Sequence, residues 1–381
     1  MNLQPTAEQD LLRRTVREFA EAEMRPHVAT WDEAQGFPPE LVGRLAALGL
    51  MGIEVPEAEG GAGLSALDYC ICIEELARVD PSIALSVAAH NGLAVAHLAR
   101  FGNEAQRARY LKPLAEGRTL GGWALTEAGS GSDAAAMRTT ARQDGDGWVI
   151  SGSKQFITHG RLAGTLIVIA VTDPAKGTHG MSAFVVERRT PGLRAGRKEN
   201  KLGMRASDTS EVIFDDCRVP AESLIGLQGE GFIQTMQVLA GGRVGLAALA
   251  VGLAQGAYEA ALAYALARRQ FGRPIAQFQA IRWKLADMAT RLEAARWLTY
   301  RAAWFRDRPD ARASTSSSVA KLYASETAVR AAEECVQIHG GYGFVKDYPA
   351  EKYFRDVKLC TIGEGTSEIQ RLVIARDLLG R

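Results

Sequence analysis

Cysteine is scarce in this chain of 381 residues, and its distribution excludes two common uses of the residue. The sequence has no CxxC pair, and an odd number of cysteines at irregular spacing favours neither a disulfide framework nor a zinc site. We therefore expect no bound metal and a reduced, cytoplasmic compartment. The five cysteines are Cys70, Cys72, Cys217, Cys335 and Cys360.

An excess of charge of one sign is also missing. The chain has 45 basic and 44 acidic residues, and a net charge of +1 argues against a nucleic-acid-binding surface. It contains neither a GxGxxG fingerprint nor a Walker loop, so the sequence does not indicate a Rossmann or P-loop nucleotide site.

The sequence shows no sign of a leader or of a membrane-spanning run. Arg13 and Arg14 are followed by polar, charged and apolar residues at 15–18 and not by an apolar run, which does not fit a twin-arginine signal. The most apolar stretch, 244–254, is short and is followed at once by Gln255. We expect that stretch to be a buried helix, and we expect no membrane span.

Two changes in hydrophobic period divide the chain into helical, strand-rich and helical parts. Its length predicts two or three domains. A capping-box pattern at Thr6–Gln9 and helix starts at Ser65 and Pro81 mark the first part. The hydrophobic residues recur with the period of two that is typical of strands from about Gly121, and with the helical period again from about Gly231. This predicts a β-barrel or sandwich followed by a helical bundle. Expected strands include 166–170, 183–186 and 212–214, and expected late helices are 231–270, 279–307 and 313–339, with a connector at Pro309.

A carboxylate between two glycines, Gly363-Glu364-Gly365, is the candidate centre of the site. Glycines remove Cβ atoms and let the backbone approach a ligand closely. Thr366 or Ser367 can then begin a helix whose free N–H groups and positive dipole end suit a phosphate. The alternative interpretation is a turn between two helices with an exposed acid.

Two further segments are rich in glycine or hydroxyl groups. Residues 123–133 offer N–H and hydroxyl groups for a polar ring or a phosphate, although a surface loop explains them equally well. Residues 337–343 place three glycines at a helix end, which indicates close packing of the backbone and would suit contact with a ligand. His339 in that segment is interpreted as a helix-capping residue.

Taken together, these motifs resemble those of the acyl-CoA dehydrogenase family, in the family's order and over essentially the whole chain. The resemblance implies an α+β multidomain fold: a helical N-terminal domain (1–120), a β-barrel-like middle domain (121–228) and a four-helix-bundle C-terminal domain (229–381). The matching segments are 124–136, 156–158, 268–272, 337–343 with Asp347, Lys352 and Asp356 at the family spacing, and 363–366.

The resemblance also implies the chemistry, which is FAD-dependent oxidation of an acyl-CoA thioester to a trans-2-enoyl-CoA. Glu364 matches the base that removes the α-proton, while flavin N5 accepts the β-hydrogen as hydride. The family places the thioester oxygen on the Glu364 N–H, as in an oxyanion hole. Burial would have to raise the pKa of this carboxyl toward working pH.

The resemblance carries over the ligand contacts residue by residue. It further implies a homo-oligomer, usually a tetramer, because a neighbouring subunit completes each flavin site, and electron-transfer flavoprotein as the electron acceptor. Expected FAD contacts within one chain are Trp123, Leu125, Thr126, Ser132, Phe156, Thr158, Thr366 and Glu368, and those from a neighbouring chain are Arg268, Gln270, Phe271, Gln279, Gln337 and Gly341. Expected substrate contacts are Ser132, Arg243, Gly363 and Gly365.

Two positions depart from the family's pattern, and a third bears on the choice of base. Ala240 stands where an Asp often contacts pantetheine, and Gly363 stands where straight-chain enzymes often have Tyr. The missing ring should leave space beside the reacting carbons, so we expect short or branched acyl chains. Gly242 occupies the position from which some relatives supply the base, which leaves Glu364 without a rival.

Other readings of the same fold remain open. One is an oxygen-reactive flavin enzyme, either an acyl-CoA oxidase or a monooxygenase, although oxidases are usually longer and monooxygenase relatives generally lack the Glu. A non-catalytic scaffold or DNA-binding relative would be expected to carry a basic extension, which the near-zero charge argues against.

Overall fold

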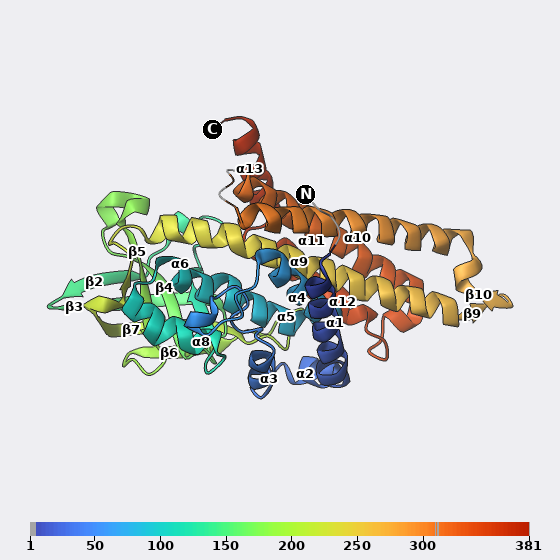
Figure 1. Cartoon of the computed structure of the whole chain (residues 1–381), viewed down its shortest axis with the longest axis horizontal. Helices are drawn as coiled ribbons and strands as arrows, with labels where there is room; N and C mark the ends of the chain where they lie inside the picture. The colour runs from blue at the N-terminus through green and yellow to red at the C-terminus, as the bar shows by residue number, and fades with distance from the viewer. Residues whose placement is uncertain (1–4, 309, 311, 381) are drawn as a thin grey trace.

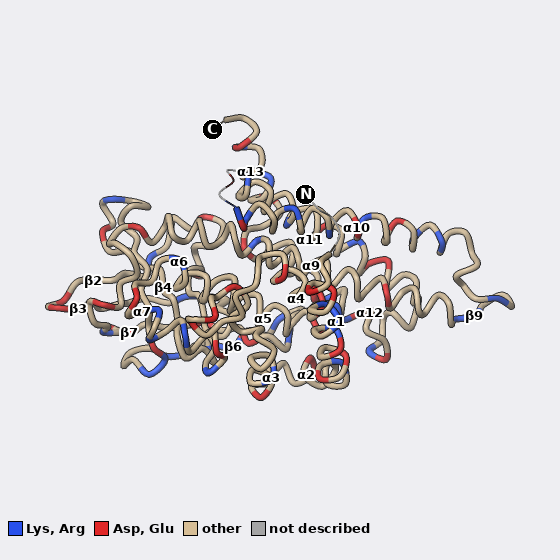
Figure 2. Tube along the Cα trace, in the orientation of Figure 1, with Lys and Arg blue, Asp and Glu red and all other residues tan. Residues whose placement is uncertain are grey.

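The computed structural model describes residues 5–308, 310 and 312–380, and its regions are arranged along one long axis (Figure 1). The strands of the eight-stranded sheet gather at one end, and long helices run from them toward the other end, where β9 and β10 lie, with the N-terminal helices packed alongside. The order of helical, sheet and helical parts confirms the predicted fold class. Acidic and basic residues are interspersed along the chain (Figure 2). The predicted connector at Pro309 lies outside the described residues.

Side-chain caps start the N-terminal helices where the sequence indicated. Thr6 accepts from the backbone N–H of Gln9, whose side chain accepts in return from Thr6, and this is the predicted capping box. Ser65 caps the fourth α-helix in the same way, and Asp80 caps the helix that begins at Pro81. The elements are α1 (Ala7–Phe19), η1 (Ala20–Met24), η2 (Arg25–His27), α2 (Val28–Ala34), α3 (Leu41–Ala47), η3 (Glu57–Glu59), α4 (Ala66–Val79), α5 (Pro81–Ala89), η4 (His90–Val95), α6 (Ala96–Phe101), α7 (Glu104–Gln106), η5 (Arg107–Leu111) and α8 (Lys112–Ala115).

The middle part is an eight-stranded mixed sheet of order β6-β7-β3-β2-β4-β5-β8, with β1 parallel to β4. Strands β2 and β4 join through Thr140 and Val171, so two groups of strands meet at this point. The sequence did not indicate β2 or β6, because both are largely exposed and carry few apolar residues. The elements are β1 (Gly121–Ala124), η6 (Ala134–Ala136), β2 (Thr140–Asp144), β3 (Gly147–Thr158), β4 (Thr165–Val171), η7 (Pro174–Gly180), β5 (Met181–Glu187), β6 (Leu193–Lys198), β7 (Thr209–Pro220), η8 (Ala221–Ser223) and β8 (Leu224–Ile225).

The C-terminal part is a bundle around one long helix, α9, which packs against α10, α11 and α4. Alanine and glycine cover most of its buried surface and allow the close approach of neighbouring helices. The elements are α9 (Gly231–Ala267), β9 (Arg269–Gln270), β10 (Arg273–Pro274), η9 (Ile275–Gln277), α10 (Gln279–Arg306), α11 (Ala313–His339), η10 (Gly340–Gly343), α12 (Ala350–Asp356), η11 (Val357–Thr361) and α13 (Ser367–Leu378).

Two helical stretches of the described chain, 81–101 and 231–267, are long and apolar enough to cross a membrane by length and composition alone. In the most apolar window of each, 78% and 72% of the residues are buried inside the fold. A core helix gives this pattern, and α9 is the central helix of the bundle.

A buried ion cluster ties the three parts of the chain together. Lys352 Nζ lies 2.9 Å from Asp80 Oδ1 and 2.6 Å from Asp356 Oδ2. The other oxygen of Asp356 accepts from the backbone N–H of Met204, which follows the sixth strand. Neither carboxylate is exposed to solvent, so both depend on the lysine for compensation of their charge.

Candidate active site

The Glu364 turn follows directly from its glycines and its cap. The last 3₁₀ turn ends as Ile362 and Gly363 both donate to the carbonyl of Leu359. Glu364 and Gly365 then adopt φ values of +53° and +94°, and the chain reverses into α13. The predicted cap is confirmed, since the Thr366 side chain accepts from the backbone of the third helical residue.

Two side chains hold the carbonyl groups of this turn. Lys321 Nζ, from α11, donates to Gly365 O at 2.7 Å, and Gln370 Nε2 donates to the same oxygen at 2.9 Å. Gln370 also donates to Glu364 O at 3.3 Å. In the described part of the chain the Glu364 N–H donates to no protein acceptor, so it is free to receive a ligand oxygen.

The carboxyl group of Glu364 lies against α9 at a position where only glycine fits. A Cβ atom at Gly242 would lie 2.3 Å from Glu364 Oε2 and 3.0 Å from Leu93 Cδ2. Although the residue as a whole is half-buried, Oε2 is fully buried and has no hydrogen-bond partner among the described residues.

Burial gives this carboxyl group a pKa that would suit a base. It raises the pKa of Glu364 to about 7, against the opposing charges of Lys321 and Arg243. A pKa close to working pH is what proton abstraction from a carbon acid requires. Burial acts on the lysine as well and lowers the pKa of Lys321 to about 8.

Arg243 stands beside this carboxyl group and forms no salt bridge with a carboxylate of the described residues. Its side chain is buried, and Nη1 lies 3.5 Å from Ser318 Oγ. Its Nε finds no acceptor within the described structure, and burial lowers the pKa of Arg243. A Cβ atom at Gly363 would meet Leu359 and Leu246 at ordinary contact distances of 3.5–3.7 Å.

The middle-domain residues expected to contact FAD lie on the first and third strands and the loop between β1 and β2. Trp123 Nε1 donates to His97 Nδ1 at 3.1 Å, while Phe156 sits at a bulge with φ +59° and a 61% exposed side chain. The buried Lys154 donates to Leu125 O at 2.9 Å and so fixes the strand end. Thr126 and Thr158 are half-buried, and Ser132 is exposed.

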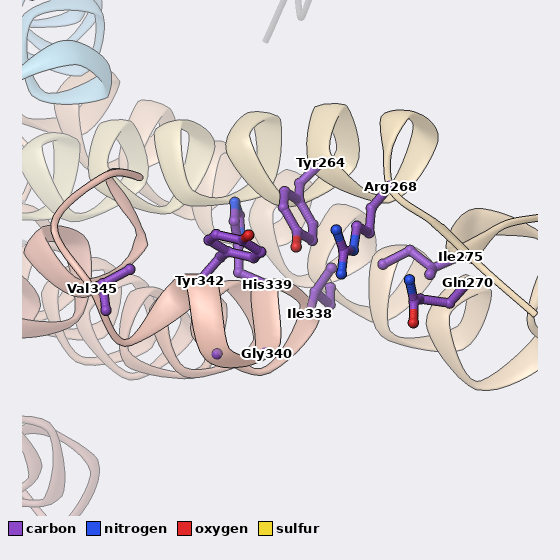
Figure 3. Close-up of a pocket in the computed structure, with 10 residues that line it drawn as sticks. Tyr264, Arg268, Gln270, Ile275, Ile338, His339, Gly340, Tyr342 and Val345 are labelled. Atoms are coloured by element: carbon purple, nitrogen blue, oxygen red, sulfur yellow. The ribbon is translucent and has the colours of Figure 1, made fainter.

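A second group of expected FAD contacts surrounds a surface pocket of about 530 Å³ at the far end of α9 (Figure 3). Arg268, Gln270 and Gly341 line it together with aromatic residues, and all three are exposed. Phe271 at the tip of the β9–β10 turn is 92% exposed. The remaining members of the group, Gln279 and Gln337, are also exposed.

His339, in the wall of this pocket, fits its interpretation as a helix-end residue. Its Nδ1 donates to Cys335 O at 2.8 Å, one turn back along α11. Its ring stacks on Tyr264 with centroids 4.2 Å apart.

The two groups of expected FAD contacts cannot meet in one chain. Helix α9 begins against β5 and ends at the β9–β10 turn, and its 37 residues span about 55 Å. Figure 1 shows the sheet and this turn at opposite ends of the molecule. The structure brings Glu364, Arg243, Gly363, Gly365 and Thr366 together around one turn, with the exposed Glu368 in the first turn of α13.

Some residues with positive φ are among the expected ligand contacts. Seven non-glycine residues of the described chain have positive φ, and three of them, Phe156, Phe271 and Glu364, are among the expected contacts. Such conformations persist where surrounding structure imposes them, commonly at functional sites.

Sequence reasoning missed the residues that position the carboxylate. Lys321 is flanked on its helix by Ser317, Ser318, Ala320 and Ala324, and this small-residue face was a signal that its side chain is buried. No local pattern distinguished Gln370 from other polar residues. The space provided by Gly242 depends on helices far apart in sequence.

The comparisons with known proteins agree with one another. Profiles of the acyl-CoA dehydrogenase N-terminal, middle and C-terminal domains match residues 6–118, 122–217 and 229–379. An acyl-CoA dehydrogenase of Bacillus subtilis is 47% identical over 98% of this chain and 99% of its own length. A short-chain specific acyl-CoA dehydrogenase of Clostridium acetobutylicum is 44% identical with the same coverage.

Solved structures share the whole fold. Butyryl-CoA dehydrogenase of Megasphaera elsdenii superimposes with a TM-score of 0.97 at 40% identity, covering all of both chains. A chain solved in work on the electron transferring flavoprotein of Acidaminococcus fermentans superimposes with a TM-score of 0.98 at 43% identity, and the match covers all of both chains. A glutaryl-CoA dehydrogenase of Mycobacterium smegmatis, solved with FADH2, superimposes with a TM-score of 0.93 at 32% identity. The match covers 99% of this chain and 96% of that chain.

The fold and the buried carboxylate thus define a flavin-dependent oxidoreductase. More narrowly, the chain belongs to the acyl-CoA dehydrogenase family, and it is an enzyme that dehydrogenates acyl-CoA with FAD as its cofactor. The residues present suit that cofactor. Ser367 Oγ, a hydroxyl that can donate, is buried without a partner in the described chain at the start of α13, where a phosphate would meet free N–H groups.

Proposed function

We propose that the enzyme converts a short- or branched-chain acyl-CoA to the trans-2-enoyl-CoA, with Glu364 as the base that removes the α-proton. The observation that carries this proposal is the buried Oε2, which has no protein partner in the described structure while burial raises the pKa of the carboxyl to about 7. The short-chain specificity of the Clostridium acetobutylicum relative and the butyryl-CoA specificity of the Megasphaera elsdenii enzyme support the substrate class.

The turn around Glu364 would stabilise the charge that develops on the substrate. Its free N–H is suited to donate to the thioester oxygen, which becomes more negative as the α-proton leaves. Lys321 and Gln370 keep the carbonyl groups of the turn engaged and thereby hold this N–H in place before the reaction. FAD, when bound, supplies the acceptor for the β-hydrogen.

FAD would be held between copies of the chain. One copy would supply the middle-domain contacts together with Thr366 and Glu368, and a second would supply the group around the far end of α9. The sheet and the β9–β10 turn lie at opposite ends of α9, whose 37 residues span about 55 Å, and this arrangement supports a homo-oligomer, for which we propose a tetramer. The exposed aromatic ring of Phe271 fits a surface that a second copy covers.

The substrate would lie between Glu364 and the CoA-binding residues. We propose that Ser132 and Arg243 contact the pantetheine arm and form part of the active-site wall, and that Gly365 makes a backbone contact. The pantetheine hydrogen bond that an Asp often makes in the family is missing, because this position is Ala240. The absence of a tyrosine ring at Gly363 supports short or branched acyl groups.

The domain limits, partner and compartment complete the proposal. We propose domains at 1–120, 121–228 and 229–381, a cytoplasmic location, and electron-transfer flavoprotein as the acceptor. The near-identical fold of the chain solved in work on that flavoprotein in Acidaminococcus fermentans supports the acceptor.

Anaerobic titration with acyl-CoA tests the base. Glu364→Gln should purify yellow, bind butyryl-CoA and fail to bleach, because a carboxamide keeps the shape but cannot accept a proton. Glu222→Gln, a change at an exposed carboxylate remote from the turn, serves as the control and should bleach like the wild type. Turnover of Glu364→Gln near the wild-type rate would show that another group is the base.

A substrate panel tests the acyl chain. Butyryl-, isobutyryl- and 2-methylbutyryl-CoA should be oxidised faster than octanoyl-CoA, and a strong octanoyl preference contradicts the short-chain assignment. Oxygen consumption without an added acceptor would instead favour an oxidase on this fold.

A further inference from the structure

We propose that the ring of Tyr69 closes the inner end of the acyl pocket and sets the length of acyl chain that the enzyme accepts. This inference rests on the proposed function of the Glu364 site.

Tyr69, on α4, projects into a gap left by two glycines of other helices. Its side chain is fully buried, and its hydroxyl donates to Ala88 O at 3.3 Å. A Cβ atom at Gly245 of α9 would lie 2.3 Å from this hydroxyl, and one at Gly92 of η4 would lie 3.1 Å from it. The phenol therefore occupies the position that a methyl group at Gly245 would need. It also lies close to the position that a methyl group at Gly92 would take.

The same face of α9 carries the base. Gly242 and Gly245 are three residues apart, so their Cβ directions share a helix face and lie about 5–6 Å apart. Glu364 Oε2 fills the first position and the Tyr69 hydroxyl fills the second. The carboxylate and the phenol thus lie about one helical turn apart along α9.

The direction from Glu364 to Tyr69 leads into the protein. Glu364 is half-buried, whereas Tyr69 is fully buried within the central core. The CoA portion of a substrate is large and polar and must remain toward solvent, so its acyl tail points inward from the base. Leu93, which reaches within 3.0 Å of the Gly242 Cβ position, gives the tail an apolar side wall.

A partly buried ion pair stands behind the ring. The guanidinium carbon of Arg306 lies 5.9 Å from the Tyr69 ring centroid, and Arg306 Nη2 lies 2.8 and 2.6 Å from the two oxygens of Glu54. Arg306 Nη1 is buried without an acceptor in the described part of the chain. An apolar tail that displaced the ring would meet these charges, and removing their polar contacts is unfavourable.

Chain-length profiles of Tyr69 variants in the FAD-loaded enzyme test the inference. Wild type should prefer butyryl-CoA to octanoyl-CoA, and Tyr69→Phe, which keeps the ring, should have the same profile. Tyr69→Leu should raise the octanoyl-to-butyryl ratio of kcat/KM at least tenfold, mainly through a lower KM for octanoyl-CoA. Tyr69→Met keeps the core filled with a flexible side chain and should shift the ratio likewise if the leucine variant does not fold.

The outcomes separate this inference from the proposed function. A wild-type flavin that no acyl-CoA bleaches would contradict the proposed function itself. A wild type active on butyryl-CoA, with both smaller variants within twofold of its ratio, would overturn the role of Tyr69 alone.

Discussion

Replacing Gly242 by alanine tests the geometry of the active site with a single methyl group. The new Cβ would lie 2.3 Å from Glu364 Oε2, whereas ordinary contacts of a Cβ atom begin near 3.4 Å. The carboxylate must therefore move by about 1 Å, and a misplacement of that size costs roughly a hundredfold in rate, or about 2.7 kcal/mol of barrier. We expect kcat/KM for butyryl-CoA to fall by about that factor.

The neighbouring Gly241→Ala variant is a matched control. A Cβ atom there would meet the Arg306 guanidinium at 3.4–4.0 Å, which is ordinary contact. Alanine is favoured over glycine in a helix interior by about 1 kcal/mol, so both changes add the same intrinsic helix stability. Only the Gly242 variant should lose activity.

Steady-state kinetics with an artificial acceptor, together with urea unfolding of both variants, measures the two effects separately. The reasoning is refuted if Gly242→Ala keeps more than a third of wild-type kcat/KM while remaining folded. Equal losses in both variants would refute it as well, because they would trace the effect to the helix rather than to the carboxylate.

Four further outcomes follow from buried charges. The kcat/KM for butyryl-CoA should rise with pH through a limb near 7, because burial raises the pKa of Glu364 to about 7 and only the ionised group accepts a proton. A pH-independent rate from pH 5 to pH 9 would contradict this. Folding favours the protonated acid, so the stability of the FAD-free protein should fall as pH rises from about 4.5 through 7, a dependence that Glu364→Gln should weaken. Lys321→Met should move the kinetic limb to higher pH, since its cation lowers the pKa of Glu364, and an unchanged or acid-shifted limb would exclude that role. Lys352→Met should lower the free energy of unfolding, measured in urea, by about 3–5 kcal/mol, because Asp80 and Asp356 lose their buried counter-ion. A loss under 1 kcal/mol would show that the two carboxylates do not depend on the lysine.

Local signals in the sequence were reliable where one short segment decides the structure. The caps at Thr6, Ser65 and Thr366 each depend on a side chain reaching the backbone a few residues away, and all three form as expected. The expected strands with continuous apolar runs also form. The exposed strands β2 and β6 lack such runs, since their partners rather than their own residues fix them.

The active site was predictable in its central residue and unpredictable in its support. Glu364 stood out because two glycines flank it in a motif of the family. Lys321 and Gly242 act on it across 43 and 122 positions of sequence, through the packing of α11 and α9 around the turn. No local periodicity contains such contacts, because they depend on how helices meet in space.

Helix α9 also makes the length of the chain a determinant of the site. One inserted residue in a continuous helix rotates everything beyond it by about 100° and advances it by about 1.5 Å. A surface loop can absorb an extra residue, but α9 runs unbroken for 37 residues between the sheet and the β9–β10 turn. The number of residues from Gly231 to Ala267 therefore constrains the protein as strictly as a catalytic motif does, whichever residues occupy the exposed positions in between.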